Sequence, residues 1–284
     1  MANNTTINNE LFTNLLAEAQ FAAYETSIAR QIVTPFDYPA NAGSTLQVPI
    51  YSSVTAVDLS EGQAPSSADT NTTSATVNLS EVGTYFQVTD FLRDSAERDV
   101  ISDLGFNAGR AIAEKMDTDV FSLFSSFNNS VGVEDSAVTV DNIFEAVATL
   151  RQNKIVGPLT AVLGPRQALQ LKKELATAGG ANLTASEIGS SVLREYYIGS
   201  IAGVQVFESS LVDQTVDSDS DTELNTVGAI FAPTAIGHAM RGGVNMETQR
   251  QAAKRAEDIM MHVVKGEVIL QNNHGVKIVG SASD

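Results

Sequence analysis

The sequence contains no cysteine, and this absence excludes several kinds of chemistry and of stabilisation. Disulfide bonds, thiolate nucleophiles and zinc or iron–sulfur sites built from cysteine are all impossible. The chain has 284 residues, enough for one large domain or two modest ones. Its stability must therefore come from packing, from hydrogen bonds or from association with neighbouring chains.

Long apolar runs are also missing. No stretch approaches the ~20 residues that are needed to cross a bilayer. The first residues, MANNTTINNELF, lack the basic start and the apolar stretch of a secretory signal. Hydrophobic residues make up 43% of the chain and charged residues 18%, which is typical of a globular protein. We therefore expect a globular chain without a membrane segment.

Positive charge is scarce. Lysine and arginine number 17 against 34 aspartates and glutamates, so the formal net charge is −17. No lysine precedes Lys115. Because binding of nucleic acid through its phosphates requires a basic stripe, we do not expect this chain to wrap DNA. The acidic charge is consistent with simple solubility, and equally with a protein that lies near DNA without sticking to it.

Catalytic signatures are absent as well, since the sequence has no HExxH, GxSxG, GxxxxGK[ST] or strand-associated GxGxxG. The three histidines, which we expect to be structural, are His238, His262 and His274. The stretch DQTVDSDSDTE at 213–223 begins like a calcium loop. However, Thr222 and Gly228 stand where the EF-hand requires glycine and glutamate. We predict a solvated acidic loop there, and neither a catalytic site nor a bound cofactor or metal.

The first ninety residues contain a helix pattern followed by strand patterns. Apolar residues at helical spacing over residues 8–33 predict an amphipathic helix, which is either an ordinary core helix or an arm on a neighbouring subunit. Residues 44–90 alternate and predict a long two-stranded hairpin with a tip rich in Gly, Pro, Ser, Asp and Asn. Because isolated two-stranded ribbons are marginal in water, we expect another chain to cover the second face of this hairpin.

A long helix is predicted next, over residues 91–127. Apolar residues form an i, i+4 ridge along it, and the opposite face carries charged residues that include Asp117. The helix would be roughly 55 Å long if unbroken, so we expect it to lie along a sheet built from distant segments. Gly105 and Gly109 each cost about 1 kcal/mol in a helix interior. They either let another backbone approach closely or mark a bend.

The remainder alternates helix and strand patterns. Within residues 136–245 we predict a helix with Asp141 as its N-cap, a short buried strand, a helix with Pro165 in its first turn, and further strands. This is an α/β or α+β lobe with its own core. Residues 260–280 read as two strands around a turn at 271–275.

This order of elements resembles the major capsid proteins of tailed double-stranded DNA bacteriophages with the HK97-type fold. Three stretches carry the resemblance: TVNLSEVGTYFQVTDFLRDSAERDVISDLGFNAGRAIAEKMDTDVF, AVLGPRQALQLKKELA and GSIAGVQVFESSLV. The resemblance implies an α+β fold and extends over nearly the whole chain. The parts that it implies are an N-arm (1–43), an E-loop (44–90), a P-domain part with a long spine helix (91–135), an α/β A-domain (136–245) and closing P-domain strands (246–284).

The resemblance also implies a mechanical function. Identical copies would form hexamers and pentamers that close into an icosahedral shell around DNA in the virion, after assembly in the host cytoplasm. Implied partners are a portal and decoration proteins, with no sequence-specific DNA contact and no membrane. Only about forty residues precede the hairpin, so we expect a separate scaffolding protein. Some relatives cross-link an E-loop lysine, which is excluded here because residues 44–90 contain neither Lys nor Arg.

We expect the hairpin to dock on an adjacent subunit by shape and by charge. The acidic residues that the hairpin carries are Asp58, Glu61, Asp69 and Glu81. The basic residues expected to receive them are Arg241, Arg250, Lys254, Arg255, Lys265 and Lys277. Exposed ion pairs contribute only ~0–1 kcal/mol each, so repetition around the shell must supply the strength.

Three other interpretations stay open at the level of the sequence. An encapsulin-like nanocompartment would share the fold and enclose protein cargo, so the packaged material discriminates it. A soluble α/β enzyme with a hairpin lid would be a stable monomer with an apolar pocket. A phage tail or surface-layer protein would assemble into tubes or sheets instead of closed shells.

Overall fold

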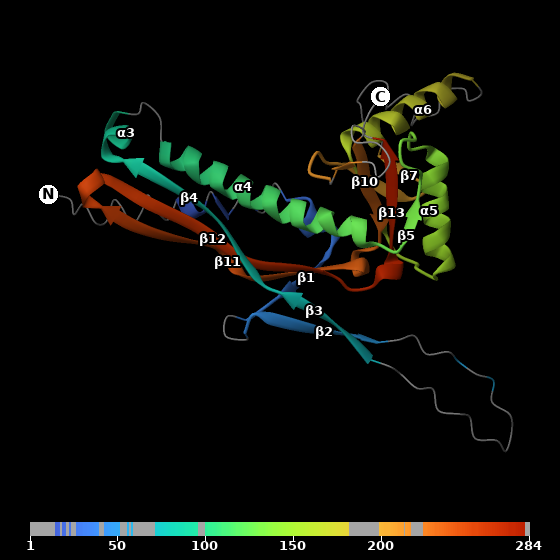
Figure 1. Cartoon of the computed structure of the whole chain (residues 1–284), viewed down its shortest axis with the longest axis horizontal. Coiled ribbons are helices and arrows are strands. Elements are labelled where there is room, and N and C mark those ends of the chain that lie inside the picture. Colours follow the sequence, from blue (N-terminus) through green and yellow to red (C-terminus); the bar gives the residue numbers. More distant parts are fainter. Residues whose placement is uncertain are drawn as a thin grey trace, which may run out of the picture.

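The structure of the chain is a computed structural model. It describes residues 15–17, 19–20, 23, 27–39, 43–51, 56, 58, 72–95, 100–181, 199–212, 214–216 and 224–281. The residues before Leu15, the hairpin tip at 59–71 and most of the acidic loop at 213–223 lie outside this set. The described residues form three β-sheets, with helices packed on two of them (Figure 1).

A long four-stranded sheet runs along the subunit. Its strands, in spatial order, are β1 (Thr34–Asp37), β11 (Ile236–Gln251), β12 (Ala256–Ile269) and β4 (Ser80–Thr89). Strand β1 is parallel to β11, and the other neighbours are antiparallel. Strands β11 and β12 have 16 and 14 residues, against a usual ~5–6. Their hairpin is therefore long enough to support a long helix.

The helix α4 (Val100–Ser122) lies along one face of this sheet (Figure 1). Its buried side chains, among them Ile112 and Met116, pack against Ile259 and Met261 of β12. The prediction that the long helix lies on a sheet from distant segments is confirmed. The predicted helix over 91–127 is divided in the structure, however. The elements in that range are α3 (Asp90–Ser95), α4 and the 3₁₀ turn η1 (Leu123–Ser126), with residues 96–99 outside the described set.

Gly105 and Gly109 allow the N-terminal segment to approach α4 closely. A Cβ atom at Gly109 would overlap the carbonyl oxygen of Ala19, and one at Gly105 would collide with the side chain of Leu15. Helix α4 continues through both glycines. Leu15, Ala19 and Ala23 are buried against α4 of their own chain. These described residues therefore make the contacts of a core helix within their own chain.

The predicted hairpin over residues 44–90 is divided at Leu79. Strands β2 (Thr45–Tyr51) and β3 (Thr72–Asn78) pair only with each other, as a separate two-stranded sheet that we call the ribbon. Strand β4 instead pairs with β12. The prediction of one long hairpin was therefore wrong in its second half, because the partner of β4 comes from the far end of the chain. In Figure 1 the ribbon extends away from the rest of the subunit.

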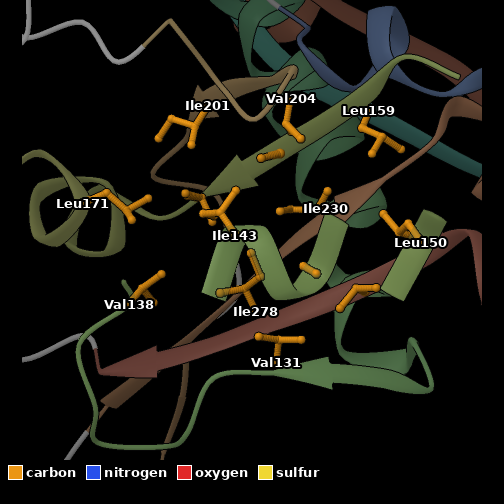
Figure 2. Packing of buried hydrophobic residues seen from close by; sticks show 14 of the residues in the cluster. Val131, Val138, Ile143, Leu150, Leu159, Leu171, Ile201, Val204, Ile230 and Ile278 are labelled. Atoms are coloured by element: carbon orange, nitrogen blue, oxygen red, sulfur yellow. The ribbon is translucent and has the colours of Figure 1, made fainter. Parts of the chain in front are cut away.

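A seven-stranded sheet forms the second lobe. Its main order is β5 (Asn129–Val131), β13 (Gly275–Ser281), β10 (Leu224–Phe231), β6 (Leu159–Leu163), β8 (Val204–Glu208) and β7 (Ser200–Ile201), with β9 (Gln214–Val216) paired to β10. Helices α5 (Val140–Gln152) and α6 (Pro165–Ala181) bury apolar side chains against it. Figure 2 shows Ile143 and Leu150 of α5 pointing toward Ile230 and Ile278 of the sheet.

The other core of this lobe joins it to α4. Phe121, Phe124 and Phe127, at the end of α4 and just beyond it, pack with Phe231 of β10. The helix α2 (Ala29–Ile32) contributes Ala29 and Ile32 to the same cluster. The long helix is therefore anchored in the second lobe at one end.

Two boundaries and one cap differ from the expectations. Strand β13 belongs to the seven-stranded sheet, so residues 246–284 do not all close the long sheet. Strand β11 begins at Ile236, inside the range expected for the A-domain. The N-cap of α5 is Thr139, which forms a capping box with Asn142, whereas Asp141 lies in the first turn. There Asp141 favours the helix through the helix dipole instead.

Candidate assembly interface

The ribbon is amphipathic. Its register places Leu46 opposite Val77, Val48 opposite Ala75 and Ile50 opposite Thr73, so these side chains share one face. Their neighbours in sequence, polar except for Pro49 and Tyr51, occupy the other face. Val77 at the base is buried, whereas the apolar residues of β2 are only partly covered. Within the described part of the chain, the apolar face is thus fully covered at its base and only partly covered beyond it.

Contacts at the base fix the point where the ribbon leaves the sheet. The hydroxyl of Tyr38 donates to the carbonyl oxygen of Thr45 at 3.0 Å. The guanidinium of Arg241 donates to the carbonyl oxygen of Gly43 and lies over the Tyr38 ring, 5.2 Å from its centroid. A Cβ atom at Gly266 would overlap the carbonyl oxygen of Asn78. Arg241 therefore supports the ribbon of its own chain.

The sheet face opposite α4 has a shallow hollow of about 350 Å³. The residues that line it are Tyr85, Glu247, Thr248, Gln249, Asp258 and Met260. Tyr85 is 61% exposed and Met260, its cross-strand partner, is 36% exposed. Hydrogen bonds from Gln87 and Tyr85 lower the pKa of Asp258, and the bond to Asp258 raises the pKa of Tyr85. The hollow therefore combines exposed apolar surface with an ionised carboxylate.

The structure does not bring the predicted acidic residues together. Asp58 is exposed. Glu81 lies on β4 instead of the ribbon, with its Oε1 3.8 Å from Nε2 of His262 of the same chain. Glu61 and Asp69 lie outside the described residues.

The predicted basic residues are dispersed too, because several are held by their own chain. Arg250 binds both carboxylate oxygens of Asp90, each at 2.6 Å, and Lys277 donates to the carbonyl oxygen of Ser125 at 3.3 Å. Lys254 and Arg255 are exposed at the turn between β11 and β12. Arg255 Nε lies 3.9 Å from Asp90. Only this turn presents two of the predicted cations at one exposed place.

Lys265 is 0% exposed, and its ammonium donates to Asp119 and Glu267 at 2.6 Å each. It cannot face another subunit while it keeps these partners. Burial raises the pKa of Asp119, but hydrogen bonds from Lys115 and Lys265 outweigh burial and lower it. Burial likewise raises the pKa of Glu267, and His238 and Lys265 beside it outweigh that effect and lower it.

Asp117 was expected on the polar face of the long helix and is in fact buried. Its carboxylate accepts hydrogen bonds from the Ser27 hydroxyl at 2.6 Å and from the backbone N–H groups of Ile28 and Ala29 at 3.0 and 3.1 Å. Burial raises its pKa, against these bonds. The sequence does contain one signal, since Asp117 lies four residues before the buried Phe121. We call Asp117, Asp119, His238, Lys265 and Glu267 the joint cluster, because it connects the N-terminal segment, α4 and the long sheet.

None of the helices in the described ranges is long and apolar enough to cross a membrane. In the same ranges, no three His, Asp or Glu side chains are grouped so that they could hold a metal ion.

The sequence matches the family described as phage capsid protein over residues 72–263, which is more than half of the chain. No curated protein matches it. Among solved structures, it is similar to the capsid of the cyanophage P-SCSP1u, with a TM-score of 0.69, 15% identity and coverage of 90% of this chain and 89% of that chain.

Two further structures are similar at the level of the fold. For the head of Helicobacter pylori bacteriophage KHP40, the TM-score is 0.69 at 13% identity, with 91% of each chain covered. For the virus-like particle from Pyrococcus furiosus, the TM-score is 0.61 at 13% identity, with 94% of this chain and 98% of that chain covered.

Proposed function

The chain belongs to the phage capsid protein family, and on this premise we propose that its copies form hexamers and pentamers that close into an icosahedral shell around double-stranded DNA. It has the HK97-type fold and is a structural component of the virion, not an enzyme. Capsid assembly requires many copies of one chain, so the molecule acts as a homo-oligomer.

The observation that carries the proposal is the incomplete apolar face of the ribbon. Leu46, Val48 and Ile50 remain partly open to solvent in the single chain. Full burial of such a side chain contributes ~1.5–3 kcal/mol, and a lone two-stranded ribbon is marginal in water. A neighbouring copy that covers this face would supply the missing burial, repeated at every subunit of a shell.

We propose the hollow at Tyr85 and Met260 of a second copy as the receiving surface. These side chains present exposed apolar area, and the turn with Lys254 and Arg255 lies at the same end of the β11–β12 hairpin. The apolar face of the ribbon would cover the hollow, and the acidic residues Asp58, Glu61 and Asp69 would approach the two cations. Arg250 and Lys265 have partners in their own chain and contribute little to this contact.

A pair of adjacent variants tests this proposal. Val48→Asp places a charge on the apolar face, and Gln47→Asp places the same charge on the exposed face of the same strand. We expect Val48→Asp chains to stay folded, by circular dichroism, and to sediment as small species, whereas Gln47→Asp chains assemble like the wild type. Equal assembly of the two variants, seen by sedimentation velocity and negative-stain microscopy, would contradict the proposal.

The division into parts is also a proposal. We propose an N-arm (1–43), an E-loop (44–90), a spine helix region (91–135), an A-domain (136–245) and closing strands (246–284), with three adjustments that follow the sheets. Strand β4 and strand β11 go with the long sheet, and β13 goes with the A-domain sheet.

The partners are proposed on the same premise. A separate scaffolding protein would guide assembly, a portal would occupy one vertex, and decoration proteins would bind outside. Mass spectrometry of purified virions and of immature particles tests each of them, since a scaffold should be present only in the immature particles.

A second function is favoured by one comparison. The similarity to the virus-like particle from Pyrococcus furiosus covers 94% of this chain, so a shell that encloses protein is the competing proposal. Extraction of purified particles decides between them. Double-stranded DNA inside supports the phage capsid, whereas a defined protein cargo without DNA supports the nanocompartment.

A further inference from the structure

One end of the second lobe is built from segments that contain no carboxylate. The segments that meet there are η1 and β5, the end of α5, the end of β10, and the 3₁₀ turn η4 (Asn272–His274) with the start of β13. They belong to four stretches without Asp or Glu, 120–133, 146–173, 224–246 and 268–281, although the whole chain has 34 such residues. In a protein with a formal net charge of −17, such a region favours an acidic partner.

Hydrogen bonds join these segments into one surface. The side-chain amide of Asn153 donates to the carbonyl oxygen of Asn273 at 3.2 Å, which connects the end of α5 to η4. The side-chain amide of Asn272 donates to the carbonyl oxygen of Ser126 at 3.1 Å, and its side-chain oxygen accepts the N–H of Asn128 at 2.6 Å. We call residues 125–128, 151–156 and 272–277 the acid-free surface.

The acid-free surface carries three cations. Arg151 donates to the carbonyl oxygen of Ile155 at 3.2 Å, and Lys277 donates to a backbone carbonyl oxygen of η1 at 3.3 Å, so each uses only part of its donors. Lys154 is exposed. Among the residues that the structure describes, none of the three forms an ion pair. Val156 beside them is 88% exposed, so positive charge and apolar area are both open to a partner.

The acidic loop lies at the opposite end of the same lobe. Its carboxylates are Asp213, Asp217, Asp219, Asp221 and Glu223. Strand β10 starts directly after the loop and ends at the acid-free surface, where the N–H of Ala232 donates to the carbonyl oxygen of His274 at 3.0 Å. Strands β10 and β13 run along the lobe (Figure 1), and the 8 residues of β10 span roughly 25 Å.

The loop is too short to cover the acid-free surface of its own chain. Val216 and Leu224 pair with each other, so residues 217–223 leave and return to one place. At ~3.5 Å per residue, their backbone extends about 14 Å from that place at most. Arg151 and Lys154, beyond the far end of β10, are therefore out of reach of the loop within one chain. Another copy can bring the two surfaces together.

On the premise of the shell proposed above, we infer that the acidic loop of one copy docks on the acid-free surface of the next copy. The two surfaces lie at opposite ends of one lobe, so the contact runs head to tail, and such contacts between identical copies close into rings. The contact therefore joins neighbouring subunits within a hexamer or a pentamer. Several ion pairs act together with Val156, because each exposed pair alone is weak and screened by salt.

Nucleic acid is the other polyanion that a phage shell contains. The loop fits the acid-free surface better, because every subunit carries one loop for its one surface, whereas binding along phosphates requires a longer basic stripe. The negative charge of the whole chain also opposes binding of DNA.

Charge reversal on each side tests the contact. Arg151→Glu with Lys154→Glu reverses the surface, and Asp219→Lys with Asp221→Lys reverses the loop. We expect each variant alone to stay folded, by circular dichroism, and to assemble only at a roughly tenfold higher concentration than the wild type, by sedimentation velocity. A mixture of the two variants restores every contact in rings where they alternate, so it should assemble near the wild-type concentration. Because alternation requires an even number of subunits, electron microscopy of the mixture should show sheets or tubes of hexamers without pentamers.

Three results would overturn the inference. They are assembly of either variant at the wild-type concentration, a mixture that assembles no better than its components, and normal shells of the surface variant with less packaged DNA, which would assign the surface to nucleic acid. The proposed shell is tested separately by Val48→Asp and would stand in each case.

Cross-linking of the unchanged chain gives an answer even if a variant fails to fold. A carbodiimide joins an amine directly to a carboxylate that touches it. Particles assembled from equal parts of unlabelled and ¹⁵N-labelled chains would be cross-linked, digested and analysed by mass spectrometry. We expect Lys154 to be linked to residues 217–223 in peptide pairs that combine one labelled and one unlabelled peptide. No link between Lys154 and the loop, or links only between peptides with the same label, would contradict the inference.

Discussion

The ribbon and the joint cluster satisfy their side chains in opposite ways. The ribbon leaves the apolar side chains of Leu46, Val48 and Ile50 partly uncovered. The joint cluster buries charged groups, and Lys265 finds both of its carboxylate partners inside the chain. The comparison teaches where to look for assembly. Charges that are already paired fix the shape of one subunit, whereas apolar surface that is left open is, on our proposal, what joins one subunit to the next.

Loss of the buried cation is the most severe way to break the joint. Lys265→Met leaves the largely buried Glu267 without its ammonium partner and leaves Asp119 with Lys115 alone, and this should destabilise the subunit by ~3–5 kcal/mol. Denaturant unfolding of the full chain measures the loss. Lys277→Met is the control, because Lys277 only donates to a backbone carbonyl oxygen near the surface. Similar losses of unfolding free energy in both variants would mean that the buried Lys265 stabilises the subunit no more than Lys277 does.

The close approach of the N-terminal segment should give the next largest effect. Gly109→Ala improves helix propensity by about 1 kcal/mol, but its Cβ atom would overlap the backbone of Ala19. Overpacking of this kind costs ~1–3 kcal/mol, so we expect net destabilisation in a thermal melt. Gly157→Ala has open space around it and should be close to neutral. A stabilised Gly109→Ala would show that the two backbones are not in contact.

The N-cap of α5, in the second lobe, should give the third largest effect on stability. Thr139→Ala removes a capping-box partner and should cost ~0.5–2 kcal/mol, measured by chemical denaturation. Asp141→Ala removes only a charge in the first turn and should cost ~0.3–1 kcal/mol. A larger loss of stability in Asp141→Ala than in Thr139→Ala would make Asp141 the cap, as the sequence alone predicted.

Removal of the charge contact between subunits should have the smallest effect on stability per residue. Lys254→Gln combined with Arg255→Gln should lower the salt concentration at which particles dissociate, because each exposed pair contributes ~0–1 kcal/mol and is screened by salt. Light scattering across a sodium chloride series follows the dissociation. Lys173→Gln, at an exposed position of α6, is the control for loss of one surface charge elsewhere on the chain. An unchanged dissociation curve in the double variant would show that the acidic residues of the hairpin do not bind this turn.

Local pattern predicted the elements well and their partners poorly. The α+β class and the long helix are confirmed, because periodicity over ten or more residues reports which face of an element is buried. It does not report what covers that face. The pairing of β4 with β12 joins residues such as Phe86 and Ile259, far apart in the chain, and no local signal marks it. The same limit placed β13 in the wrong sheet.

The candidate site was harder to predict, for an electrostatic reason. The count of basic residues does not tell which of them find partners inside the chain, and Lys265 of β12 points to Asp119 of α4 while Lys254 and Arg255 lie in the exposed turn before that strand. Burial of Asp117 depends on Ser27, ninety residues away, and a single helix pattern cannot reveal it. The contacts of the hairpin acids with a neighbouring subunit stay a prediction.

The central claim is that the apolar face of one ribbon is covered by the sheet of another copy, and the absence of cysteine permits a direct measurement. Chains with Ile50→Cys and chains with Met260→Cys would be purified separately, mixed during assembly and then oxidised. The account predicts disulfide-linked pairs that contain one chain of each kind, at a yield well above that of a Gln47→Cys and Met260→Cys mixture. Equal yields in the two mixtures, or no mixed pairs at all, would contradict it.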